Sequence, residues 1–317
     1  MSVCSAESSA VDEPLAGTAP YARAWIVIEH PGAWGPDAVV ESDLPEAVRA
    51  NLRNAKAAGV SVLLARHPDR PERAAAMDTN VWVARSAAGG QLLRHAQLTS
   101  LLPLAEWDLP AIAAGSLPAI GSVSHQPLLL VCTHGRRDRC CAVNGRALLT
   151  GLLAAASPAQ RDRIWECSHV GGHRFSPVTV SLPSGAVHGR LDVSQAPDLL
   201  ERLDSGRVIV DNLRGRSGFL APCQAAAGAV RRLTGIDDDD VLDVLRLRNG
   251  RAVPPSPDLV ELNEAVAEVR HSDGRAWAVE LERVPLSGPR AESCGAEPVS
   301  AAAAWVARQV TPSTPWS

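Results

Sequence analysis

Apolar and polar positions along the first hundred residues predict a strand, a helix, a second strand and a hairpin. AWIVIEH at 24–30 has the pattern of a buried strand, and VSVLLA at 60–65 that of another. Between them, the apolar spacing of LPEAVRANLRNAKAAG predicts an amphipathic helix that begins near Pro45 and ends at Gly59. VWVARS and QLLRHAQL, separated by AAGG, then predict two antiparallel strands.

The same order of elements returns after a connector at 116–126 that contains Pro, Gly and Ser. PLLLVC predicts a strand ending at Cys132, residues 142–156 a helix, and RIWECSH a strand ending at His169. VTVSLPSGAVHGRL predicts a hairpin and APDLLERLDSG a short helix. This order is typical of a thioredoxin-like layer. We therefore expect a three-layer α/β fold, and we add the hypothesis that the two halves are a distant duplication.

The pattern changes near residue 236. DDDDVLDVLRLR is interpreted as a helix whose acidic first turn suits the helix dipole, and AVAEVRHSDGRAWAVELERV as two strands. No chemistry is expected of the remaining tail. The predicted divisions are a flexible leader at 1–20, an N-terminal α/β subdomain at 21–115, a thioredoxin-like domain at 116–235 and a small C-terminal α+β extension at 236–317.

Composition and charge narrow the class of protein. The chain has 317 residues, of which 46% are hydrophobic and 21% charged, so a globular protein is expected. The net charge of -4 gives no reason to expect a nucleic-acid partner. Neither a signal peptide nor an apolar run of ~18 residues is found, so we expect a cytoplasmic protein with no membrane partner. With seven cysteines and no export signal, metal binding or redox chemistry is favoured over a disulfide framework.

Two cysteines and two histidines follow the ends of predicted strands. They are Cys132 and Cys141, and His169 and His173. Loops at that edge of an open α/β sheet face one crevice, so the four side chains are expected to converge. Zinc accepts two Cys and two His, and so does a [2Fe–2S] cluster, whereas a metal-free dithiol needs no His. The gap of eight residues between the cysteines is wider than that of common zinc fingers, which weakly favours the larger group.

The quoted motifs resemble a known family. CTHGRRDRCCAVNGRAL at 132–148 with HVGGH at 169–173 is similar to the sucrase/ferredoxin-like family, as are WIVIEHPGAWG at 25–35 and LRGRSG at 213–218. The resemblance covers roughly residues 24–230 and implies a thioredoxin-like ferredoxin of the bis-histidinyl type with one [2Fe–2S] cluster. It implies Cys132 and Cys141 as thiolate ligands, with Cys140 as the competing residue, and His169 and His173 as imidazole ligands.

Further residues are expected to support this site. His134 is a candidate for contact with the ligands, and Gly171 and Gly172 would let the backbone pass close to a cluster. Arginines are expected to stabilise the reduced cluster or to dock an acidic redox partner; they are Arg136, Arg137, Arg139, Arg174, Arg214 and Arg216. Histidine ligands make the cluster less negative than four cysteines would, which predicts a higher, pH-dependent reduction potential.

The expected function is electron transfer, as a carrier or redox partner rather than a stand-alone enzyme. Two alternatives stay open. One is a structural or regulatory zinc protein with the same four ligands, and the other is a metal-free thiol redox protein using Cys140 or Cys141. The absence of a C-x-x-C pair argues against the second alternative. The electron donor, the electron acceptor and the oligomeric state cannot be predicted from the sequence.

Overall fold

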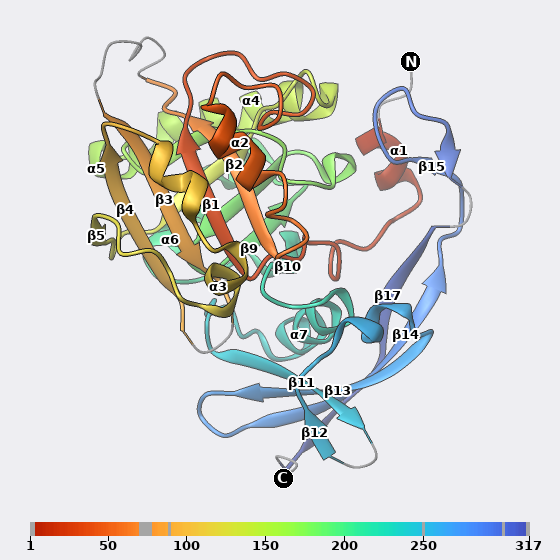
Figure 1. Cartoon of the computed structure of the whole chain (residues 1–317). Helices are drawn as coiled ribbons and strands as arrows, with labels where there is room; N and C mark the ends of the chain where they lie inside the picture. The colour runs from red at the N-terminus through yellow and green to blue at the C-terminus, as the bar shows by residue number, and fades with distance from the viewer. Residues whose placement is uncertain (1–3, 70–77, 88–89, 249–250, 300–301, 315–317) are drawn as a thin grey trace.

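The computed structural model describes residues 4–69, 78–87, 90–248, 251–299 and 302–314, and every structural statement concerns this part of the chain. A large α/β body is joined to a smaller antiparallel sheet, which is formed by the C-terminal part of the chain (Figure 1). The α-helices are α1 (Cys4–Ala10), α2 (Glu46–Leu52), α3 (Leu109–Ala114), α4 (Arg139–Ala155), α5 (Pro158–Arg161), α6 (Ala196–Asp204) and α7 (Ala221–Thr234). The short 3-10 helices are η1 (Leu102–Glu106), η2 (His173–Phe175), η3 (Val193–Gln195), η4 (Val210–Asn212) and η5 (Pro257–Glu261).

One continuous ten-stranded sheet forms the body, in the order β10-β9-β8-β6-β7-β2-β1-β3-β4-β5. Its first-half strands are β1 (Ala24–Glu29), β2 (Val60–Arg66), β3 (Thr79–Arg85), β4 (Leu92–Leu98) and β5 (Ser122–Val123). Its second-half strands are β6 (Leu128–Cys132), β7 (Ile164–Cys167), β8 (Val178–Leu182), β9 (Ala186–Gly189) and β10 (Leu213–Arg216).

The two halves have the same strand order and directions. In the first half β1 pairs parallel with β2 and antiparallel with β3, which pairs antiparallel with β4. In the second half β6 pairs parallel with β7 and antiparallel with β8, which pairs antiparallel with β9. The prediction of an α/β fold with two thioredoxin-like halves is confirmed by this topology.

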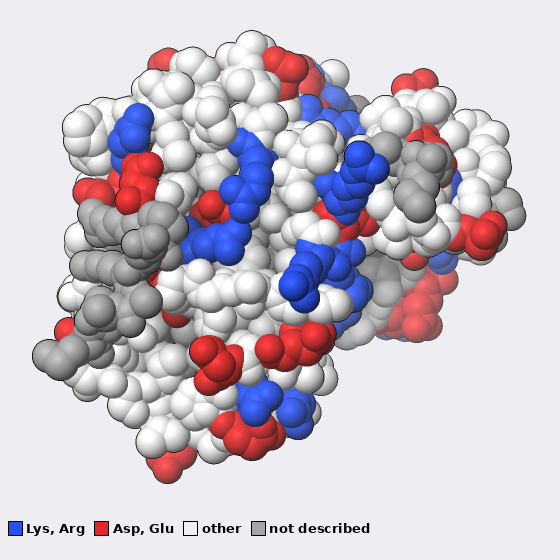
Figure 2. Space-filling model, turned by 90° about the horizontal axis from the view of Figure 1, so that it is seen from above, with Lys and Arg blue, Asp and Glu red and all other residues white. Residues whose placement is uncertain are grey.

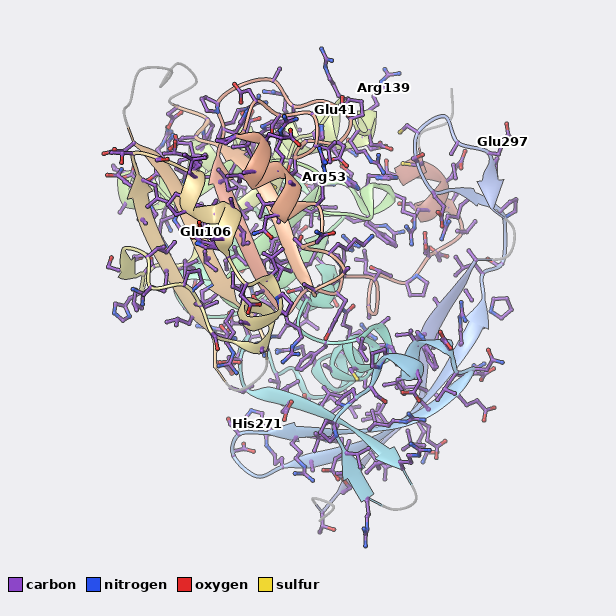
Figure 3. The ribbon with its side chains drawn as sticks, viewed as in Figure 1. Glu41, Arg53, Glu106, Arg139, His271 and Glu297 are labelled. Carbon is purple, nitrogen blue, oxygen red and sulfur yellow. The ribbon has the colours of Figure 1, made fainter. Side chains whose placement is uncertain are left out.

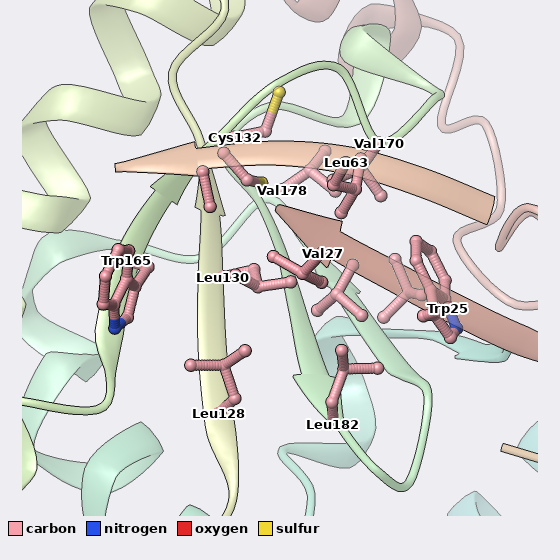
Figure 4. Packing of buried hydrophobic residues seen from close by; sticks show 14 of the residues in the cluster. Trp25, Val27, Leu63, Leu128, Leu130, Cys132, Trp165, Val170, Val178 and Leu182 are labelled. Atoms are coloured by element: carbon pink, nitrogen blue, oxygen red, sulfur yellow. The ribbon is translucent and has the colours of Figure 1, made fainter. Parts of the chain in front are cut away.

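The halves meet at strands β2 and β7, which pair antiparallel. Alternate positions of the central strands point into one shared core: Trp25 and Val27 from β1, and Leu130 and Cys132 from β6 (Figure 4). The intervening residues pack outward, those of β1 under α2 and α3, and those of β6 under α4 and α6. The period of two along each strand thus places Cys132 at the rim of the inner core.

The C-terminal sheet has the order β12-β11-β13-β14-β17 and packs against α7 (Figure 1). Its strands are β11 (Leu242–Arg248), β12 (Arg251–Val253), β13 (Glu264–His271), β14 (Ala276–Pro285) and β17 (Ala303–Ser313); β15 (Arg290–Ala291) and β16 (Pro298–Val299) form a separate pair. The predicted pair of strands around Asp273 and Gly274 is confirmed.

The helix predicted from residue 236 was wrong, because this segment is strand β11. Leu242 and Val244 are buried and Asp243 between them is exposed, which is the alternation of a strand. The acidic run is instead used in ion pairs: Asp237 lies 2.6 Å from Arg202, and Asp240 lies 3.0 Å from Arg216. Helix α7 was missed, although Pro222 in its first turn and Gly235 at its C-terminal cap are ordinary helix signals.

The expectation of a flexible leader at 1–20 was also wrong for its described residues. Helix α1 buries Cys4 and Ser8, and Glu13 is only 3% exposed. The described part of the leader is fixed in place because its polar groups bond to buried partners. A sequence without tertiary structure does not reveal these partners. The other predicted boundaries, 115/116 and 235/236, stay predictions. None of the helices in the described ranges is long and apolar enough to cross a membrane.

Candidate metal centre

Strand β6 and helix α4 bring Cys132 and Cys141 together. Cys132 is the last residue of β6, and Cys141 lies in the first turn of α4, which begins at Arg139 rather than at the predicted 142. The helix approaches the strand closely because residue 145 is glycine. A Cβ at Gly145 would lie 2.1 Å from the Cys132 carbonyl oxygen, too close for any other residue.

His169 completes a compact group with the two cysteines. The ligand atoms of Cys132, Cys141 and His169 all lie within 4.8 Å of one another. His169 follows β7, which ends at Cys167, two residues earlier than predicted. His173, on η2, lies beside it, with its Nδ1 3.4 Å from His169 Nε2 and the ring centroids 5.0 Å apart. His173 therefore adjoins the three-residue group and is not part of it.

The two thiols of the group have opposite electrostatic environments. A hydrogen bond from the Cys141 thiol lowers the pKa of Cys132 well below its ordinary value; burial opposes this shift, and His169 reinforces it. The same hydrogen bond, together with burial, raises the pKa of Cys141. Cys132 is therefore the first of the pair to become a thiolate, and one proton is held between the two sulfurs. A cation bound there would release that proton.

A glycine pair lets the loop between the histidines pass against a buried arginine. Gly171 and Gly172 have φ values of 107° and 71°, which favour glycine. Arg214 Nη1 donates to the Gly171 carbonyl at 2.8 Å, and a Cβ on Gly172 would lie 2.2 Å from Arg214 Nη2. Burial lowers the pKa of Arg214 to about 9, with a further contribution from Arg174.

Five of the six predicted arginines divide into an exposed and a buried group, and Arg174 is half-buried. Arg136, Arg137 and Arg139 are exposed, and Arg139 points away from the body at the top of the molecule (Figure 3). The face seen from above carries several Lys and Arg side chains, with acidic groups toward its edges (Figure 2). Of the two roles expected for the arginines, docking a partner does not suit Arg214 and Arg216. Both lie on strand β10 and are 1% and 4% exposed.

Arg174 and His134 have different surroundings near the site. Arg174 pairs with Glu13 at 2.9 Å and lies over the Phe175 ring, 4.5 Å from its centroid. The backbone N–H of His134 helps to lower the pKa of Cys132, and the His134 ring bonds the Gly35 carbonyl at 2.8 Å. His134, Arg137 and His169 line a hollow with residues 36–39 of the first half. His134 therefore lies next to Cys132 and His169, and its role in supporting a cluster stays a prediction.

Cys140 lies away from the first group and belongs to another. It is within 3.4 Å of Cys4 and 3.0 Å of Cys294, and Asp138 completes this second cluster. The Asp138 side chain also accepts the Cys140 backbone N–H at 2.9 Å and caps α4. The C-terminal tail, from which no chemistry is expected, brings Cys294 and Glu292 into this region.

Glu292 closes the site over His173, since its carbonyl oxygen contacts His173 Nε2. The same Nε2 lies 3.5 Å from Asp138. Burial lowers the pKa of His173 despite that carboxylate. No motif in the sequence signals these contacts.

Comparison with known proteins identifies a matching protein family and a similar solved structure. A family model described as sucrase/ferredoxin-like matches residues 15–215, which contain both motifs. A solved structure titled a thioredoxin-like [2Fe-2S] ferredoxin from Aquifex aeolicus is 16% identical; the match covers 28% of this chain and 91% of that one, with a TM-score of 0.25. No curated protein matches the chain significantly.

Proposed function

The chain belongs to the sucrase/ferredoxin-like family, and we propose that it is a one-electron redox protein that holds one [2Fe–2S] cluster. The proposed ligands are Cys132, Cys141, His169 and His173. One observation carries the proposal: two thiols from β6 and α4 and an imidazole that follows β7 lie within 4.8 Å of one another, with the second imidazole beside them. Two sulfur and two nitrogen ligands are a donor set that [2Fe–2S] clusters accept.

The free side-chain atoms of the site fit such a group. His169 Nδ1 is buried and has no hydrogen-bond partner among the described residues. A buried nitrogen without a partner is costly unless it is used for something else, and metal ligation is such a use. The Cys132 and Cys141 sulfurs share one proton, so both are available as thiolates once a cation displaces it.

The surrounding residues adapt the site to one-electron chemistry. When bound, the cluster supplies a centre that gains or loses a single electron. Arg214 places a guanidinium behind the His169–His173 loop, where a positive charge favours the more negative state. The contact between the Glu292 carbonyl and His173 Nε2 fixes a proton on that nitrogen and leaves Nδ1 free to ligate.

The exposed arginines define where a partner would approach. Arg136, Arg137 and Arg139 all lie in or next to the loop between the two cysteine ligands. A positively charged surface near a redox centre speeds encounter with an acidic partner and makes the rate dependent on salt. We therefore propose an acidic electron donor or acceptor that docks over this loop.

A mononuclear zinc site is the second candidate, and the compactness of the group favours it. The three ligand atoms of Cys132, Cys141 and His169 lie within 4.8 Å of one another, which is compact enough for a single ion whose tetrahedral ligands are separated by roughly 3.8 Å. Zinc would make the same four residues a structural or regulatory site without electron transfer. The two candidates differ in colour and in the metal that is bound.

The decisive experiment is anaerobic purification followed by metal analysis, absorption and EPR spectroscopy after dithionite reduction. We expect iron, visible absorption and an EPR signal with the low average g-value of mixed nitrogen and sulfur ligation. His169→Ala should abolish these signals, while His125→Ala, at an exposed histidine, should leave them intact. A colourless protein with zinc at this site would refute the proposed function, and a reduction potential that stays constant with pH would refute histidine ligation.

A further inference from the structure

We propose that Cys4, Cys140, Cys294 and Asp138 form a second metal site, which binds a single zinc ion. The three sulfurs lie close together: Cys4 is 3.4 Å from Cys140 and 3.6 Å from Cys294, and Cys140 is 3.0 Å from Cys294. Both carboxylate oxygens of Asp138 lie 3.9 Å from the Cys4 sulfur. The four ligand atoms therefore form one compact group.

The donor atoms and their spacing indicate the ligand. Ligands of a tetrahedral zinc ion with Zn–S bonds of about 2.3 Å are separated by roughly 3.8 Å. The Cys4 contacts are close to this value, and the Cys140–Cys294 contact needs only a small opening. Three soft thiolates and one carboxylate suit zinc, whereas calcium and magnesium prefer oxygen ligands alone. Sulfurs in mutual contact leave room for one ion between them and none for a bridged pair.

A disulfide explains this arrangement less well than a metal does. Disulfide sulfurs are about 2.05 Å apart, and a disulfide joins two residues. Here each sulfur lies close to both others, and a fourth donor faces the same point. Oxidation of any pair would leave the third thiol without a role.

The site joins parts of the chain that are distant in sequence. Cys4 comes from α1, Cys140 from the first turn of α4, and Cys294 from the loop between β15 and β16. The Asp138 carboxylate holds two of these cysteines in place by accepting hydrogen bonds from their backbone N–H groups. The distances to the Cys140 and Cys294 nitrogens are 2.9 Å each. In Figure 1, α1 and β15 lie side by side at one edge of the body. A zinc ion there would fasten α1 and the loop that carries Cys294 to α4.

Fastening α1 and the Cys294 loop to α4 would keep the proposed cluster site covered. The Cys294 loop also supplies Glu292, whose carbonyl contacts His173. Asp138 contacts His173 Nε2 at 3.5 Å, so it touches both sites. The zinc site itself does not depend on the proposed function. The role of covering the first site does rest on it.

The test measures zinc and iron in the full chain, with one variant for each site and one matched control. We expect one zinc ion per chain in the native protein. Cys294→Ser should lose this zinc and keep the iron and the visible absorption. Cys132→Ser should lose iron and absorption and keep the zinc. Cys223→Ser changes a buried cysteine on α7, outside both groups, and should keep both metals.

Every other outcome of the metal analysis also upholds or overturns the second site. Zinc retained by Cys294→Ser, or a native chain without zinc, would overturn the second site. An intact mass lower by two hydrogens, with Cys140 and Cys294 joined, would overturn it in favour of a disulfide. Two zinc ions in the native protein, of which Cys294→Ser loses one, would uphold the second site while refuting the proposed [2Fe–2S] cluster.

Hydrogen exchange tests the fastening role separately. Removal of zinc with a chelator should raise exchange in residues 4–10 and 290–294 and leave exchange in α2 unchanged. Cys294→Ser should show the same rise without chelator. Equal exchange with and without bound zinc would overturn the fastening role.

Discussion

Glu13 and Arg290 form a buried ion pair with 3.0 Å between the carboxylate and the guanidinium, although 277 positions separate them in sequence. Each side chain is only 4% exposed. Arg174, next to His173, binds the same carboxylate at 2.9 Å, and Ser8 donates to it at 2.7 Å. One carboxylate thus connects the N-terminal segment, the C-terminal extension and the candidate metal centre.

Glu13→Gln should therefore destabilise the protein strongly. Removing one partner of a buried ion pair leaves the other charges uncompensated, which typically costs about 3–5 kcal/mol. The free energy of unfolding, measured with urea, should fall by this amount. Glu46→Gln is the matched control, since Glu46 is 64% exposed and pairs with Arg49 on the surface of α2. An exposed pair contributes less than about 1 kcal/mol, so equal losses in both variants would contradict the prediction.

Gly145→Ala should separate helix α4 from strand β6. The new Cβ would meet the Cys132 carbonyl oxygen at 2.1 Å, and a backbone atom cannot turn away. We expect a loss of about 1–3 kcal/mol in the free energy of unfolding and a lower metal content, because Cys141 moves away from Cys132. Gly151→Ala, on the same helix, makes its one close approach, at 2.6 Å, to Cγ1 of the exposed Val193 side chain, which can turn away; the Val193 carbonyl oxygen and the Ala196 Cβ lie at the ordinary contact distances of 3.5 and 3.6 Å. That control should keep its metal, and a normal metal content in Gly145→Ala would argue against this account of the site.

Gly172→Ala should displace Arg214. Its Cβ would lie 2.2 Å from Arg214 Nη2, in a backbone conformation with φ of 71°. Gly235→Ala has the same backbone strain, with φ of 75°, and nothing within 4 Å of the added carbon. The extra cost of Gly172→Ala over Gly235→Ala, about 1–3 kcal/mol in urea unfolding, would measure the clash alone. Equal costs would mean that Arg214 moves freely and does not fix the loop.

His188 should make the protein less stable in mild acid. Burial lowers the pKa of His188 to about 4 from 6.5, with Arg231 and Arg202 contributing in the same direction. Between these two pH values the unfolded chain binds a proton that the folded chain does not, so stability rises with pH across this window. The contribution is fully present above pH 6.5, and about 3 kcal/mol of it is lost as the pH falls to 4.

The measurement compares urea unfolding of the native protein and His188→Gln at several pH values between 4 and 6.5. The difference in unfolding free energy between the two proteins should change steadily across the window, because glutamine does not titrate. A constant difference would show that His188 keeps its ordinary pKa in the folded state.

The sequence by itself determined the fold class and the main candidate site. The period of two along the strands and the positions of Cys132 and His169 at strand ends are local patterns. Such patterns can be recognised in a sequence without knowledge of how the elements pack. The same reasoning placed the repeated order of strands and helices in both halves. It failed where local signals conflict: the acidic run 237–240 resembles a helix start, yet its carboxylates pair with arginines far along the chain.

Only the tertiary structure decided where the N-terminal segment and the Cys294 loop pack. Cys4, Cys140 and Cys294 carry no motif, because residues separated by 290 positions have no spacing that a sequence pattern can express. Nor could the sequence show that Arg214 and Arg216 are buried, since their burial depends on α7 and the N-terminal segment folding over β10. Spacing within one element or loop is fixed by covalent geometry, whereas contacts between distant segments are fixed by packing.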